Sequence, residues 1–229
     1  MISSVKELEN THQGGRLFIV ANGPSLTEEP LHLLENEVVC VVNKGYLSVD
    51  KGMLKKFDYF AIADHNVYAN LPLEFVSKTE KAKRIYVDFV TKQKYYKQED
   101  CYVYKKPHLS KPFCKSTFPK SIDSTFGTLY TVALETAVVA SFMGFKEIYL
   151  LGVDLGFKDS NKTHFYGTGE RESRISQVWN TYKNQWKVLI PQLNMFLKEK
   201  DIVFKNLSRG LVEGMPFETD RLENIIGQN

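Results

Sequence analysis

The sequence predicts an α/β domain that spans residues 1–229, with a mostly parallel sheet and helices on both of its faces. Short apolar runs recur along the chain without the alternation of half-exposed strands, which is typical of parallel strands covered on both sides. Helical patterns lie between these runs, and alternating strands and helices favour a parallel sheet. The 229 residues suit one domain with a sizeable core.

The apolar runs predict six strands, at 16–20, 37–42, 58–63, 84–89, 147–153 and 202–204. Helices are expected to begin at Ser25 and to span 128–143, 174–200 and part of 215–226. The apolar character of 128–143 on nearly all sides indicates a buried helix, in which Glu135 needs a partner. Pro191 should kink or split the helix at 174–200.

Two segments are expected to lie outside the sheet. Residues 1–15 are polar and are interpreted as a short helix followed by a loop. Residues 91–124 are rich in Lys, Tyr and Pro and show little periodicity, so they predict a long irregular excursion. Long loops in compact domains are often lids or acceptor-binding elements. The basic stretch Lys105–Lys120 within this segment suits an acidic acceptor or a membrane surface, although such a stretch is more often a solvated loop.

Composition and charge limit the classes of partner and compartment. The 30 basic and 27 acidic residues leave a net charge of +3, which does not indicate a nucleic-acid partner but suits an anionic ligand or an anionic membrane face. The three cysteines contain no CxxC pair and no zinc-ligand spacing. No signal peptide and no apolar run of about 20 residues is visible. We therefore expect a cytoplasmic protein whose membrane contact, if any, is peripheral at the inner membrane.

Polar residues follow the predicted strands at what should be one edge of the sheet. Ligands of such sheets bind beyond the carboxyl ends of the strands. Residues of this kind lie at Asn22, Gly23, Ser25, Asn43, Asp64, Asp154 and 206–208. This convergence is the main indication of a site.

The turn Ala21–Ser25 is suited to hold a phosphate. Ser25 and Glu28 have the spacing of a capping box, so a helix should begin at Ser25 and offer bare amides to an anion. Gly23 would let the ligand approach the backbone. An ordinary strand-to-helix turn, in which Ser25 only caps, explains the same residues. The pattern is neither GxGxxG nor a P-loop.

The other candidates also have two interpretations. Asn43 and Asp64 are suited to bind ribose hydroxyls or a base edge, or to cap turns. Asp154 is suited to bind a metal or orient a substrate, or to cap the segment after it. His164 is suited to remove a proton from an acceptor hydroxyl, although a lone loop histidine is more often incidental.

Three blocks of the sequence resemble one known group of proteins. Ile19–Leu26 resembles the Gly-Asn-Gly-Pro-Ser-Leu opening of the bacterial lipooligosaccharide sialyltransferases and of the related 6-hydroxymethylpterin diphosphokinase-like (MptE-like) family, a domain of unknown function. Met143–Asp154 resembles the second shared block, and Thr163–Gly167 a short third block. Together they anchor residues 15 to 210.

The resemblance implies a Rossmann-like sheet, a nucleotide-activated sugar donor that is CMP-linked in the sialyltransferases, and catalysis without a metal or other cofactor. It implies donor contacts from residues in the opening block and after later strands, namely Asn22, Gly23, Ser25, Asn43, Asp64 and Thr131. Thr168 stands where the sialyltransferases have their general-base histidine. The assignment of His164 as base is therefore our own hypothesis.

The sequence leads to three hypotheses about the function of the protein. The first is a glycosyltransferase of lipopolysaccharide biosynthesis, which moves a sugar from a nucleotide donor to a surface glycan or glycolipid acceptor. The second is a pterin pyrophosphoryl transferase that uses ATP and magnesium, with Asp64 and Asp154 as metal ligands. The third is a nucleotide-binding protein of a glycan pathway without catalytic activity. Self-association into a homo-oligomer stays open.

Overall fold

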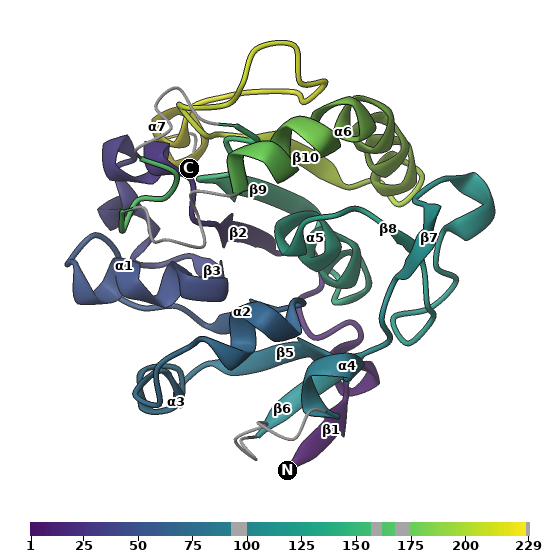
Figure 1. The fold of residues 1–229 in the computed structure, drawn as a ribbon, viewed down its shortest axis with the longest axis horizontal. Coiled ribbons are helices and arrows are strands. Elements are labelled where there is room, and N and C mark those ends of the chain that lie inside the picture. Colours follow the sequence, from purple (N-terminus) through teal and green to yellow (C-terminus); the bar gives the residue numbers. More distant parts are fainter. Residues whose placement is uncertain (93–99, 157–161, 168–174, 228–229) are drawn as a thin grey trace.

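The protein is built around one eight-stranded parallel sheet (Figure 1). In the computed structural model, the described residues are 1–92, 100–156, 162–167 and 175–227. The strand order is β1-β6-β5-β4-β3-β2-β9-β10. The bounds are β1 Ile2–Ser4, β2 Arg16–Val20, β3 Val38–Val42, β4 Tyr59–Ile62, β5 Lys83–Val87, β6 Cys101–Tyr104, β9 Glu147–Leu151 and β10 Val203–Asn206. A second, two-stranded parallel sheet pairs β7 (His108–Pro112) with β8 (Gly127–Thr128).

Helices surround the sheet, so the predicted α/β, Rossmann-like fold class is confirmed. The α-helices are α1 Leu47–Asp50, α2 His65–Ala69, α3 Phe75–Lys78, α4 Asp88–Thr91, α5 Val132–Phe142, α6 Ile175–Lys198 and α7 Leu222–Ile226. The 3-10 helices are η1 Val5–Leu8, η2 Pro24–Glu28, η3 Leu31–Leu34, η4 Asn43–Tyr46 and η5 Lys115–Thr117. None of the described helices combines the length and the apolar character needed to cross a bilayer.

The order of the strands creates a switch point between β2 and β9. From β2 the chain moves outward through β3, β4, β5 and β6, whereas from β9 it moves in the opposite direction to β10. Strands β2 and β9 are direct neighbours, with Arg16 opposite Glu147 and Val20 opposite Leu151. Open α/β sheets bind their ligands in the crevice beyond the strand ends at such a point.

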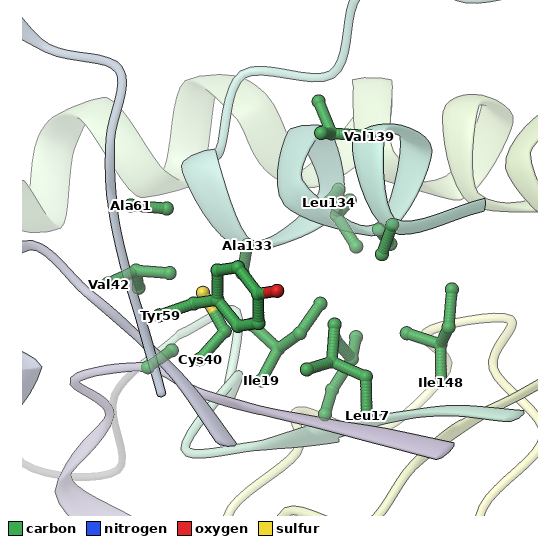
Figure 2. Packing of buried hydrophobic residues seen from close by; sticks show 14 of the residues in the cluster. Leu17, Ile19, Cys40, Val42, Tyr59, Ala61, Ala133, Leu134, Val139 and Ile148 are labelled. Carbon is green, nitrogen blue, oxygen red and sulfur yellow. The ribbon is translucent and has the colours of Figure 1, made fainter. Parts of the chain in front are cut away.

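Helix α5 lies over this central part of the sheet. Figure 2 shows Ala133 and Leu134 of α5 above Leu17, Ile19 and Ile148 of the strands, all of them buried. The helix is apolar all round because the sheet covers one side and α6 packs against it as well. It begins at Val132, later than predicted, because Thr128 belongs to β8. Gly144, with a φ of +98°, follows its end.

Pro191 was expected to kink or split the long helix, and of these two outcomes the split is wrong. Helix α6 continues through Pro191 from Ile175 to Lys198. A proline inside a helix removes one backbone hydrogen bond and crowds the preceding turn. Ile190 and Leu193 on either side of it are fully buried, so packing against the core holds both halves in one helix.

The two segments that were expected outside the main sheet supply the two outermost strands at one of its edges, β1 and β6. Residues 2–4 form β1 instead of a helix, and residues 101–104 form β6, which lies between β1 and β5. Cys101 and Tyr104 are buried, which explains why this short run pairs in spite of its basic surroundings. The rest of the excursion is anchored by Phe113, which is fully buried and contacts Phe118, Phe126 and Phe196. An irregular excursion over 91–124 is therefore not what the described residues form.

Glu135 finds its partner on the strand that the sequence did not predict. Tyr104 of β6 donates a hydrogen bond from its hydroxyl to Glu135 Oε2 over 3.2 Å. Both groups are buried, and burial raises the pKa of Glu135 to about 7 against the opposing effect of the Tyr104 hydrogen bond. A carboxyl that is this deeply buried favours its neutral form.

We expect the stability of the protein to fall as the pH rises from about 4.5 to about 7. The folded state holds the Glu135 proton more tightly than the unfolded state, so its contribution is complete below the unfolded pKa and is lost as the pH passes through the folded pKa. Glu135→Gln should flatten the profile of the unfolding midpoint against pH across this window, and it should be more stable than the wild type above it. The exposed Glu199→Gln serves as the control. Parallel profiles for all three proteins would contradict the assignment.

Candidate functional site

A pocket opens at the switch point, beyond the carboxyl ends of β2, β3 and β9 and at the start of α5. Its cavity volume is about 100 Å³. The lining residues come from five segments of the chain: Ala21, Asn22, Gly23, Val42, Asn43, Thr131, Val132, Gly152, Val153, Asp154, Leu155, Gly156, Thr163 and His164. Sites for whole small molecules usually measure about 300–1,000 Å³. This cavity has room for one part of a nucleotide.

Asp154 and Ser25 bind each other across the switch point. The Ser25 hydroxyl donates to Asp154 Oδ1 over 2.5 Å, and the Ser25 amide donates to Asp154 Oδ2 over 3.0 Å. Both residues are more than nine-tenths buried. This pair, which we call the Ser25–Asp154 clamp, joins the loops after β2 and β9.

The clamp contradicts the prediction that bare amides at Ser25 hold a phosphate. The Ser25 amide is taken by Asp154, the Gly23 amide donates to the Gly152 carbonyl over 2.7 Å, and the Leu26 amide donates to the Gly23 carbonyl. The predicted capping box is wrong as well, because η2 is a 3-10 helix that begins at Pro24 and has no side-chain cap. Its amides are satisfied within the protein, so an anion has no donor there.

Asn22 and Asn43 bring two unsatisfied oxygens to the pocket. Asn22 is 9% exposed and donates from Nδ2 to the Val42 carbonyl over 3.0 Å, which fixes its amide between β2 and β3. The Oδ1 atoms of Asn22 and Asn43 are both buried and have no hydrogen-bond partner among the described residues. Buried polar atoms are nearly always paired in native proteins, so two such acceptors in one pocket favour a ligand that donates hydrogen bonds.

Thr131 and the start of α5 form another wall of the pocket. Thr131 is the N-cap residue of α5, and its side chain makes no capping hydrogen bond in the described structure. The first-turn amides of an α-helix have no acceptors inside the helix and carry about half a positive charge. Tyr130, directly before Thr131, has a φ of +58°, a strained value for a bulky residue. Asn43 and Leu155 also have a positive φ, so three residues in this rarely populated backbone conformation lie in or next to the pocket.

His164 reaches the pocket on a short loop that is tied to β2. The Phe165 amide donates to the Asn22 carbonyl over 3.1 Å. The His164 ring stacks on Tyr166 with 5.0 Å between centroids, and its Nδ1 lies 3.0 Å from the Thr163 hydroxyl. Lys44 Nζ lies 5.1 Å from the centre of the Tyr166 ring. Ring stacking and the Thr163 contact define the orientation of the imidazole.

Asp64, like Ser25, is a predicted site residue that does not line the pocket. Its carboxylate caps α2 by accepting from the Asn66 amide over 2.7 Å. Among the described residues, no group of three or more His, Cys, Asp or Glu side chains is placed to hold a metal ion. Asp154 lines the pocket whereas Asp64 does not, so the two carboxylates expected for a magnesium site do not share it.

Residues 206–208 brace the end of β9 and do not line the pocket. Asn206 Nδ2 donates to the Val153 carbonyl over 2.9 Å, and the Val153 amide donates to Ser208 Oγ over 2.8 Å. These contacts place Asp154 for its bond with Ser25.

Seven lining residues were not among the predicted site residues. They are Val42, Val132, Gly152, Val153, Leu155, Gly156 and Thr163. Gly152 could have been found from the sequence, because it is a glycine directly after the strongest predicted strand, and its φ in the structure is +65°.

No described residue of 91–124 lines the pocket, so the expected lid is not found there. Thr168, which aligns with the general-base position, lies outside the described residues.

Comparison with solved structures finds the same fold in two glycosyltransferases. The MAf glycosyltransferase of Magnetospirillum magneticum AMB-1 matches with a TM-score of 0.55 and 18% identity, over 94% of this chain and 34% of the other. The sialyltransferase CstII of Campylobacter jejuni, in complex with a substrate analogue, cytidine-5′-monophosphate, matches with a TM-score of 0.54 and 17% identity, over 91% of this chain and 86% of the other. The chain thus spans about a third of the length of the first. No protein-family model and no curated protein sequence matches.

The close packing around the clamp predicts that Gly23→Ala is poorly tolerated. A Cβ at Gly23 would lie 2.5 Å from both Asp154 Oδ2 and the Gly152 carbonyl oxygen, so one of them must move. We expect a loss of about 1–3 kcal/mol in the free energy of unfolding, measured by denaturant titration. Gly15→Ala is the control, because its nearest contact would be at 3.4 Å. Equal stabilities of the two variants would contradict the prediction, because Asp154 or Gly152 could then move aside at no cost in stability.

Proposed function

We propose that the protein is a glycosyltransferase that binds the nucleotide of an activated sugar, with CMP as the favoured nucleotide, in the pocket between β2 and β9. The observation that carries this proposal is the pair of buried, unpartnered Oδ1 atoms of Asn22 and Asn43 at the switch point. The likeness in fold to two glycosyltransferases, one of them in complex with cytidine-5′-monophosphate, supports the choice of donor.

The two asparagine oxygens select for hydrogen-bond donors on the ligand. Each is a carbonyl oxygen that accepts and cannot donate. Ribose carries two hydroxyl donors, and cytosine carries an amino group, so a cytidine offers the required chemistry. The Nδ2 bond from Asn22 to Val42 fixes which atom of that amide faces the pocket. A phosphate alone would leave both acceptors unsatisfied.

The phosphate of the donor is assigned to the start of α5, in place of the turn at Ser25. Thr131 and Val132 line the same pocket as the two asparagines, and the bare first-turn amides there favour negative charge. Transfer of the sugar leaves an extra negative charge on the nucleotide phosphate, so the same amides stabilise the leaving group. Gly23, Ser25 and Asp154 then act indirectly, by holding Asn22 and the two loops in place.

His164 is assigned as the general base. An acceptor hydroxyl attacks the anomeric carbon, His164 takes the hydroxyl proton, and the bond between that carbon and the phosphate oxygen breaks with its electron pair moving to the phosphate. In this assignment Nδ1 donates its proton to the Thr163 hydroxyl oxygen at 3.0 Å, and Nε2 is the nitrogen that accepts the proton of the acceptor hydroxyl. The acceptor would be a glycan or glycolipid hydroxyl. The proposal needs no metal ion and no further cofactor.

The nucleotide is tested by thermal shift with CMP, UDP, GDP and ATP, each with and without magnesium. We expect CMP to stabilise the protein without magnesium, by about 2.7 kcal/mol at 100 times its Kd. Asn22→Ala and Asn43→Ala should each weaken CMP binding about three- to ten-fold, because each removes one hydrogen bond. Asn70→Ala, on the exposed end of α2, is the control. Stabilisation by ATP with magnesium alone would favour pyrophosphoryl transfer, and no response to any nucleotide would refute the proposal.

The assignment of the base is tested with His164→Ala. We expect release of CMP from a CMP-linked sugar in the presence of acceptor to fall by about 10²–10⁴-fold, the usual contribution of a general base. CMP binding should stay within about two-fold, since His164 is not assigned to the nucleotide. Thr163→Val should give a smaller loss, because it removes only the contact that orients the ring. An unchanged rate in His164→Ala, with CMP binding intact, would rule out this histidine as the base.

A further inference from the structure

Residues 105–126, which we call the basic ribbon, project a concentrated positive charge away from the pocket. The segment contains five lysines and one aspartate, whereas the whole chain has an excess of only three positive charges. It comprises β7, η5 and the approach to β8, at the right-hand margin of the molecule in Figure 1. The positive charge of the protein is therefore gathered on one small element.

The outer side of this ribbon is open to solvent. All five residues of β7 are exposed, and so are Lys105, Lys115 and Lys120. Lys105, Lys111, Lys115 and Lys120 form no ion pair with any residue in the described part of the chain. Leu109, the second residue of β7, is 58% exposed and is flanked in sequence by these lysines.

The ribbon is held rigidly from its inner side. Phe113 is fully buried and packs 5.6 Å from Phe196 of α6, between ring centroids. The His108 amide donates to the Phe126 carbonyl, and the Phe113 amide donates to the Thr128 carbonyl. The lysines are thus presented on a fixed surface of the fold.

We propose that the basic ribbon binds the surface of an anionic lipid membrane, with Leu109 entering the headgroup region. Unpaired lysines are attracted to anionic headgroups, and an exposed leucine among them gains by leaving water at the interface. A nucleic acid is the weaker match, because the ribbon has no arginine and offers no fully exposed phenylalanine ring for base stacking. Phe113 and Phe126 are buried, and the half-buried Phe118 packs against Phe113 and Phe196. This surface shares no residue with the pocket, so the inference does not depend on the proposed function.

The test is flotation of the full chain with vesicles of phosphatidylcholine alone or mixed with phosphatidylglycerol. We expect binding to the mixed vesicles only, weaker at high salt, where screening shortens the reach of exposed charges. The variant K105E/K111E/K115E/K120E should bind at least ten-fold more weakly. The control variant K51E/K56E/K81E/K187E changes four other exposed lysines, has the same net charge and should bind like the wild type. Equal losses in both variants would overturn the proposal, since net charge alone would then explain the binding.

The substitution Leu109→Ser distinguishes binding to a membrane from binding to other polyanions. The substitution should weaken vesicle binding several-fold and leave binding to heparin or single-stranded RNA unchanged. Tighter binding of the wild type to RNA or heparin than to anionic vesicles would overturn the membrane assignment. Thermal unfolding of each variant checks that the fold is intact, and Leu109, being exposed, should tolerate the change.

Discussion

The carboxylate of Asp154 is the point on which the architecture of the site depends. It accepts hydrogen bonds from the amide and from the hydroxyl of Ser25, and in doing so it ties the loop after β2 to the loop after β9. These two strands are neighbours in the sheet but are separated by more than a hundred residues in the chain. Because both partners are buried, the bonds form in a medium of low polarity, where they are stronger and where losing one partner leaves the other unsatisfied. Ser208 and Asn206 hold the Asp154 loop from its far side.

The bonds between Ser25 and Asp154 determine which groups each loop can offer to a ligand. With the amides of η2 used internally, the turn after β2 is a structural element that presents Asn22. Among the described residues that line the pocket, the buried side-chain oxygens without partners belong to Asn22 and Asn43. The positive end of a helix is still part of the pocket, but it belongs to α5, whose 11 residues give it a stronger dipole than the single turn of η2. The site therefore has acceptors on one wall and the start of a helix on another, with His164 between the loops.

The sequence predicted the centre of the fold better than its edges. Strands β2, β3, β4, β5 and β9 are apolar runs buried on both faces, and each was located within about two residues. Strands β1 and β6 are three and four residues long and lie among polar neighbours, so their pairing depends on contacts that no local pattern records. The turn at Ser25 was misjudged for the same reason, since the partner of its amide is Asp154. The convergence of Asn22, Asn43 and Asp154 was predicted, because the ends of parallel strands share one edge, whereas Asp64 caps a nearby helix instead.

The pairing of β1 with β6 at the edge of the sheet affects how the protein can be truncated or fused. Residues 2–4 complete the sheet by pairing with residues 101–103 of β6, so the first few amino acids cover the outer backbone of a buried strand. Trimming them would bare a row of amides and carbonyls that a strand from another molecule can occupy. Shortened versions of the polypeptide should accordingly self-associate through that margin, and a fusion partner is better joined at the opposite terminus.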